Sequence, residues 1–255
     1  MEIFSKKYRI GGQGIPILCD LFVKFSQKNF FHLGEKLSDY LPLVPGSDEI
    51  ILDMLPNMTT NLSCYTTEID SEILSNPYRV WKREELLDLI YSSHPYDFPQ
   101  GDRFNYSAHM TNCVLMAEIL ESTTRTPIQE LSKELLRKYS LTNTYYSLEP
   151  FSDDEDVIRC HTNARGDWEE STFWNPSWAG DAAGYVSTPD DMLKFSERLV
   201  RTKKSNYNYG VASGRFCEGD FFCNEALLGY VGTTLHVPSR GIRLVLLSNY
   251  HDVNF

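Results

Sequence analysis

Apolar residues recur at helical spacing through much of the first two hundred residues of the chain. Pro16 suits the first turn of a helix, because its missing N–H would find no partner there in any case. We expect a helix from Pro16 that Gly34 ends. The apolar face of this helix consists of Ile17, Leu18, Leu21, Phe22 and Phe25. Further helices are expected at Glu49–Leu55, at Trp81–Tyr91, from Thr111, from Pro127 and from Pro189, the last behind the N-cap Thr188.

The pattern changes to that of β-strands after residue 207. Strands are expected at Tyr209–Phe216, Ala226–Val237 and Ile242–Asn249, with turn residues between them. A run of helices followed by a run of strands predicts an α+β fold. We expect one domain over residues 1–255, with a helical lobe at about 16–200 and C-terminal antiparallel strands at about 207–250.

The charge of the chain narrows the classes of partner. The formal net charge is −11, which argues against a nucleic-acid surface. The sequence has no apolar stretch of membrane-spanning length, so we expect no transmembrane segment. The first residues lack the apolar run of a signal peptide, and the compartment stays open.

The metal-binding residue types do not form a ligand motif. The six cysteines include no C-x-x-C pair, and the histidines are scattered without ligand spacing, so we predict no metal and no cofactor. Cys217 and Cys223 flank an expected turn and could form a disulfide, which the sequence leaves undecided.

One tyrosine stands in a recognisable setting, in Phe98-Pro-Gln-Gly-Asp-Arg-Phe-Asn-Tyr-Ser107. Tyr106 follows a turn that contains Pro and Gly and precedes an expected helix. Together with the segments at 33–42, 181–195 and 242–249, in that order, the stretch resembles the serine β-lactamases of class C type. D-Ala-D-Ala peptidases and penicillin-binding-protein-like esterases belong to the same family. The resemblance implies a β-lactamase/transpeptidase-like fold, in which an antiparallel sheet carries a helical lobe.

Relatives in that family carry strands before the nucleophile and a helix after the last strand. The sequence here lacks both, so its sheet would be short at one edge. Three explanations stay open: a compact degenerate protein, a fragment, or completion by a partner. Because an uncovered sheet edge favours association, homo- or hetero-oligomers through that edge are candidates.

The nucleophile motif of the family, Ser-x-x-Lys, is absent, since no serine in the chain has a lysine three positions later. Alignment of Tyr8-Arg-Ile10 with the family's lead-in places Gly12 at the serine and Ile15 at the lysine. Residues 8–18 contain no Ser, Thr or Lys, so a small shift of the alignment would restore neither group. Cys19 is the nearest nucleophilic type and is interpreted as a buried core thiol.

The remaining motifs are also altered. Tyr106 matches the family's proton-shuttling tyrosine, but Ala108 stands where asparagine is usual. The third motif aligns with Cys223-Asn-Glu225, where the usual cation is missing and Glu225 would repel a substrate carboxylate. The turn Gly11–Gly14 lacks the Lys-Ser/Thr of a phosphate loop, yet its N–H groups could hold an anion as a remnant oxyanion hole. The expected ligand-binding residues are Gly12, Tyr106, Ala108, Glu225 and Ala226.

We therefore predict a catalytically inactive pseudoenzyme that acts as a binding or scaffold module, with a peptide-like or small acyl compound as its expected ligand. One alternative is an active hydrolase of β-lactams, D-Ala-D-Ala peptides or esters with an unrecognised nucleophile. The other is a non-functional fragment.

Overall fold

The computed structural model describes residues 6–101, 105, 108–151, 156–201, 221–227 and 229–251. The α-helices are α1 (Ile15–Gln27), α2 (Met54–Asn57), α3 (Asp70–Ser75), α4 (Arg83–Tyr91), α5 (His109–Thr124), α6 (Ile128–Lys138) and α7 (Pro189–Arg201). The 3-10 helices are η2 (Gly11–Gly14), η3 (Leu37–Asp39), η4 (Tyr65–Glu68), η6 (Pro176–Ala183) and η7 (Pro238–Arg240). None of the helices described is long and apolar enough to cross a membrane.

Within the described residues, the strands form three small sheets. They are β1 (Tyr8–Arg9), β2 (Tyr145–Tyr146), β3 (His161–Thr162), β4 (Glu169–Glu170), β5 (Tyr185–Ser187), β6 (Phe221–Leu227), β7 (Tyr230–Val237), β8 (Ile242–Ser248) and β9 (Tyr250–His251). The longest strands make an antiparallel sheet of order β6-β7-β8. The others make the sheets β1-β5-β2 and β4-β3-β9, and in the latter β3 and β9 run parallel.

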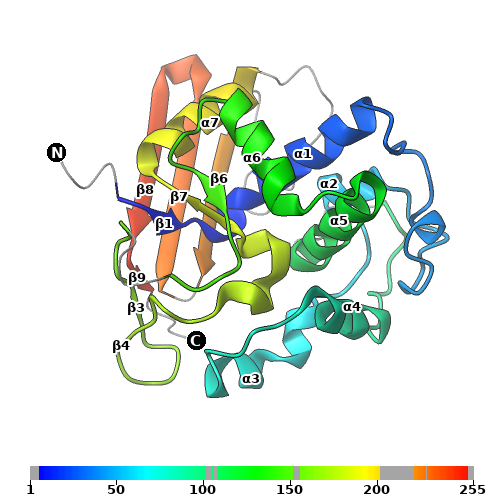
Figure 1. The fold of residues 1–255 in the computed structure, drawn as a ribbon, viewed down its shortest axis with the longest axis horizontal. Coiled ribbons are helices and arrows are strands. Elements are labelled where there is room, and N and C mark those ends of the chain that lie inside the picture. Colours follow the sequence, from blue (N-terminus) through cyan, green and yellow to red (C-terminus); the bar gives the residue numbers. More distant parts are fainter. Residues whose placement is uncertain are drawn as a thin grey trace.

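The helices gather on one side of the β6-β7-β8 sheet (Figure 1). Helix α5 packs against α1, α2, α4 and α6, and most of its residues are buried. A helix that is apolar around most of its circumference is suited to such a central position. Helix α7 lies on the sheet and buries Met192, Phe195 and Leu199 on one face. The main core therefore lies between α5 and its neighbours and extends towards the sheet.

The structure confirms the α+β class and the order of helices and strands, and it corrects several boundaries. The first helix ends at Gln27 and not at Gly34, because the chain turns at Asn29, where φ is +62°. The expected helix Glu49–Leu55 is wrong except at its end, where α2 begins. The expected strand Ala226–Val237 is also wrong, because a turn at Gly229, with φ of +100°, divides it between β6 and β7. The expected strand Tyr209–Phe216 lies outside the described residues.

Candidate ligand site

The turn η2 brings the position aligned with the nucleophile against strand β6. Gly11 has a φ of +51°, and a Cβ added there would lie 3.4 Å from Cβ of Leu227 and 3.5 Å from the carbonyl group of Ala226. Glycine is the residue that takes this backbone conformation without strain. The next residue, Gly12, is partly exposed, and Ala226 is exposed. The structure thus places Gly11, the neighbour of Gly12, against Ala226, while the predicted ligand-binding role of Gly12 and Ala226 stays a prediction.

Ile15, at the position aligned with the lysine, is fully buried in the main core. Cys19 is also fully buried, one turn further along α1. Burial, with a smaller contribution from Asp20, raises the pKa of the Cys19 thiol well above its ordinary value. A thiol that stays protonated is a poor nucleophile, which agrees with the interpretation of Cys19 as a core residue.

Gln13 anchors the same turn to the sheet, a role that the sequence analysis missed. Its side chain is buried, and Oε1 accepts a hydrogen bond of 2.6 Å from Oγ1 of Thr234 on β7. Its Nε2 lies against Gly232, where a Cβ would collide with it. Gln13 is the one polar side chain in the otherwise apolar stretch Ile10–Leu18, and this is the feature of the sequence that could have indicated a buried polar contact.

Two aromatic rings fix the other side of the turn. A Cβ on Gly14 would lie 2.6 Å from Cδ2 of Tyr185, so the turn and β5 are in direct contact. The Tyr185 ring meets the ring of Tyr146 edge to face, with centroids 5.3 Å apart. Tyr185 Oη pairs with Ser132 Oγ at 2.9 Å. Tyr185, in the segment at 181–195, therefore has a packing role against the turn.

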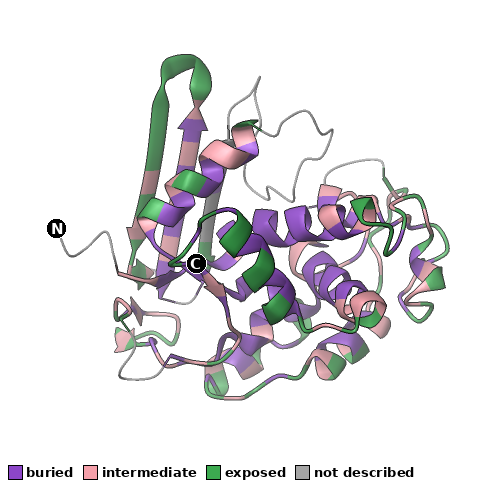
Figure 2. Cartoon of the chain, turned by 45° about the horizontal axis from the view of Figure 1, so that its top comes forward, coloured by how far each residue is buried: buried purple, intermediate pink, exposed green. Residues whose placement is uncertain are grey.

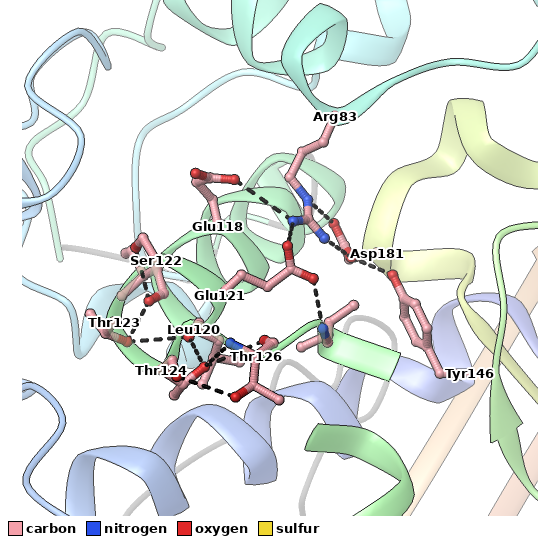
Figure 3. A network of polar contacts seen from close by, with 12 residues as sticks. Arg83, Glu118, Leu120, Glu121, Ser122, Thr123, Thr124, Thr126, Tyr146 and Asp181 are labelled. Carbon is pink, nitrogen blue, oxygen red and sulfur yellow. Dashed lines mark hydrogen bonds and ion pairs between the residues drawn. The ribbon is translucent and has the colours of Figure 1, made fainter. Parts of the chain in front are cut away.

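An ionic network around the buried Asp181 holds that segment in place (Figure 3). Arg83 donates to both carboxylate oxygens of Asp181, at 2.9 and 3.3 Å, and Tyr146 Oη donates to the same carboxylate. Arg83 also donates to Glu121, and its guanidinium lies 3.7 Å from Glu118. Burial raises the pKa of Asp181, while Arg83 and then Tyr146 oppose that rise. The network therefore joins α4, α5, η6 and β2.

Only part of the tyrosine motif lies within the described residues. Tyr106 itself lies outside the described residues. Asn105 just before it is buried, and its Nδ2 donates to the carbonyl oxygens of Thr60 and Leu62, both at 2.9 Å. Ala108 is fully buried where α5 begins. No contact of Ala108 with η2 is described, so its predicted part in ligand binding stays a prediction.

Strand β6 provides the other side of the site. The backbone of Glu225 pairs with Gly232 of β7, but its side chain lies outside the described part of the structure. Leu227 forms a small apolar cluster with Ala179 and Ala183, against which Met110 and Trp178 pack. This apolar wall could not be expected from the sequence, because its members come from α5, η6 and β6. Cys217 is not described, so the disulfide with Cys223 is untested.

The groups described around this site offer hydrogen bonds and apolar contacts. Within the described residues, no cluster of three or more His, Cys, Asp or Glu could hold a metal ion. The arrangement of η2 and β6 places two backbone segments and an apolar wall side by side. Apolar side chains beside a few polar backbone groups are the kind of lining that small-molecule sites use.

Comparisons with known proteins agree with this architecture. The chain is similar in structure to a D-stereospecific amidohydrolase from Streptomyces sp., with a TM-score of 0.80, 18% identity, and coverage of 96% of this chain and 82% of the other. It is similar to the D-amino acid amidase from Ochrobactrum anthropi SV3 complexed with L-phenylalanine amide, with a TM-score of 0.78, 17% identity, and coverage of 98% and 79%. It is also similar to a penicillin binding protein from Bacillus halodurans, with a TM-score of 0.78, 18% identity, and coverage of 97% of this chain and 82% of the other.

No curated protein sequence matches the chain. The family model described as Beta-lactamase matches residues 19–252, a range that begins downstream of Gly12 and Ile15. This match spans most of the sequence, and the structural neighbours share the β-lactamase/transpeptidase-like fold. The chain therefore belongs to the β-lactamase family.

Proposed function

We propose that this protein binds a small acyl or peptide-like ligand between η2 and β6 and does not form an acyl-enzyme. The observation that carries the proposal is the pair Gly12 and Ile15. Gly12 provides no attacking atom, and Ile15 is a buried hydrocarbon where a lysine would take up the proton. Since catalytic groups act as a unit, loss of the nucleophile leaves binding as the main remaining capacity.

The backbone around Gly12 supports binding of a carbonyl oxygen. The N–H groups in the first turn of a helix have no partner within the helix, and a helix N-terminus favours negative charge. Gly12 is partly exposed at that position, and its neighbour Gly11 lies against the exposed Ala226. We assign the ligand's carbonyl oxygen to these two backbone segments, and its apolar part to Leu227 and Trp178.

Charge restricts the ligand further. The sequence places a carboxylate at Glu225 where the family usually has a cation, and a ligand carboxylate near it would be repelled. A neutral amide avoids that repulsion. One structural neighbour is described as a D-amino acid amidase in complex with L-phenylalanine amide. An amino acid amide with an apolar side chain is therefore our first choice of ligand.

The experiment is titration calorimetry of the full chain with D- and L-phenylalanine amide, and with phenylalanine as the carboxylate control. We expect the amides to bind and the carboxylates to bind at least tenfold more weakly. Gly12 does not have a positive φ, so a larger residue fits its backbone. Gly12→Leu should abolish binding by filling the site, while Gly34→Leu, where nothing lies within 4 Å, should not. Unchanged affinity in Gly12→Leu, or absence of binding to the parent chain, would overturn the proposal.

The second candidate is hydrolysis through a nucleophile that the family motif does not reveal. It is favoured by the retained Tyr106 and by the descriptions of the neighbours as amidase and amidohydrolase. This candidate predicts measurable hydrolysis of an amide or ester that Tyr106→Phe removes. Activity that persists in Tyr106→Phe, or that the parent chain lacks, argues against it.

A further inference from the structure

Exposed apolar side chains gather along one margin of the molecule. Five of the ten large apolar side chains that are exposed in the described part of the chain lie there, each between 40% and 59% exposed. They are Ile242, Leu244, Leu246, Tyr250 and Trp168. The three aliphatic residues alternate along β8, and the ring of Tyr250 lies 5.5 Å from that of Trp168. Contiguous exposed apolar surface of this kind marks interaction sites.

The same strand is an edge of its sheet. Each of its residues pairs with β7, from Ile242 opposite Val237 to Ser248 opposite Val231. Among the described strands, β8 has no neighbour on its other side. Figure 2 shows β8 with β7 along one side and exposed residues along its length. The strand contains no proline, its register with β7 is uninterrupted, and its one charged residue, Arg243, is engaged by α7, so the edge is open to a further strand.

Charge indicates which partner fits the edge. The chain carries a net charge of −11, so two copies repel each other at most orientations. The stretch 238–251 contains no Asp or Glu and includes Arg240 and Arg243. Arg243 is paired with Glu197 of α7 at 2.9 Å, so it does not face the edge as a bare cation. Two copies of this acidic chain therefore meet with little repulsion along β8.

The strand is also complementary to itself. If two copies of β8 pair antiparallel about Val245, Leu244 of one copy lies opposite Leu246 of the other, and this pair occurs twice. Directly opposite residues of an antiparallel pair project from the same face, so the two apolar stripes would join. With a two-fold axis, both copies use the same surface in the interface, and this is the commonest symmetry of homo-oligomers.

We propose that β8 is a self-association surface, through which two copies of this chain form an antiparallel β8–β8 pair. The proposal does not depend on the ligand site. The occupant that the edge requires is an extended strand with apolar residues at alternate positions, and the chain presents such a strand in β8 itself. The result is one continuous sheet that contains β6, β7 and β8 of both copies.

The test is sedimentation velocity of the full chain across a wide range of concentrations at physiological ionic strength. We expect a monomer–dimer equilibrium. Leu244→Lys and Leu246→Glu each place an unpaired charge against leucine and should raise the dissociation constant at least tenfold. The double variant should recover most of the affinity, because each introduced cation would then face an introduced carboxylate of the other copy. Both side chains are exposed in one copy, so circular dichroism should show an unchanged fold.

Leu43→Lys is the matched control, since Leu43 is exposed far from β8 in the sequence and outside the stripe. It should leave the equilibrium unchanged. If the chain is monomeric at all concentrations, the proposal is overturned, even if another molecule can pair with the edge of β8. A dimer that both single variants leave intact, or that the double variant fails to recover, places the interface elsewhere and overturns it as well.

Discussion

Gly14 and Tyr185 are packed so closely that a Cβ on the glycine would lie 2.6 Å from Cδ2 of the ring. The contact joins the turn that aligns with the nucleophile motif to β5, which lies far along the sequence. Tyr185 is fully buried and cannot move aside without disturbing Tyr146 and Ser132. The shape of the turn η2 therefore depends on the absence of a side chain at Gly14.

Gly14→Ala should destabilise the protein, because the added methyl group meets the buried ring of Tyr185 at less than contact distance. Overpacking of this kind costs about 1–3 kcal/mol. Urea denaturation followed by circular dichroism measures the change. Gly34→Ala is the matched control, with nothing within 4 Å of its Cβ, and should alter stability by less than about 1 kcal/mol. Equal effects in both variants would show that the contact with Tyr185 is not the cause.

Thr234→Val should cost about 1–3 kcal/mol, because it leaves the buried Oε1 of Gln13 without its hydrogen-bond donor. The double variant Gln13→Met/Thr234→Val removes both hydrogen-bonding partners. Its loss of unfolding free energy should be smaller than the sum of the losses in Gln13→Met and in Thr234→Val. A double-mutant cycle of unfolding free energies measures the difference. Strict additivity would contradict the proposed anchoring of the turn to the sheet.

Arg83→Met should destabilise strongly, by about 3–5 kcal/mol at neutral pH, because Asp181 would stay buried without its cation. The folded-state pKa of Asp181 is already raised by burial, and loss of Arg83 raises it further. The folded chain then holds a proton that the unfolded chain has released, so stability falls as pH rises above the ordinary aspartate pKa. The cost of Arg83→Met should accordingly be smaller at pH 5 than at pH 7.

Arg79→Met is the surface control for this prediction, since Arg79 pairs with two partly exposed glutamates. Its cost should be much smaller than that of Arg83→Met, because both of its glutamate partners stay hydrated when the arginine is lost. Denaturant titrations of both variants at the two pH values provide the comparison. A cost of Arg83→Met that is constant with pH would show that Asp181 does not take up the proton.

Ile15→Lys should not rebuild a catalytic base. It places a cation in a fully buried position of the main core, at a cost of about 3–5 kcal/mol. Burial lowers the pKa of a lysine, so the variant should become more stable as pH rises towards the ordinary lysine pKa. Ile15→Met, which keeps the volume, should cost less than about 1.5 kcal/mol. If Ile15→Lys were as stable as Ile15→Met at neutral pH, the side chain at this position would have to reach water.

Much of the helical part could be predicted because its signals are local. Pro16, Thr188 with Pro189, and the apolar faces mark helix starts that the structure reproduces within a residue or two. The N-cap is seen directly, since the N–H of Asp191 donates to Oγ1 of Thr188. Gly34 misled the prediction of the first helix end, because the chain turns earlier at Asn29, which adopts a left-handed conformation. The boundary between β6 and β7 was missed because the turn at Gly229 was read as part of a strand.

The site was harder to predict, because its parts meet only in three dimensions. The resemblance pointed to η2 and β6, which the structure places in contact through Gly11 and Ala226, since motif order reflects the shared fold. It gave no sign that Gln13 would reach Thr234, or that Leu227 and Trp178 would form one wall. These contacts depend on how η2, η6 and β6 pack. Packing of that kind leaves no periodic pattern in a single sequence.

The most direct test of the central claim is intact mass spectrometry after exposure of the folded protein to benzylpenicillin and to a fluorophosphonate. A relative that retains Ser-x-x-Lys is treated in parallel to show that the reagents acylate or phosphonylate. For the chain in which Gly12 and Ile15 occupy the motif positions, the account predicts the mass of the unmodified protein with both reagents. A stoichiometric covalent adduct on one residue, lost when the protein is first denatured, would contradict it.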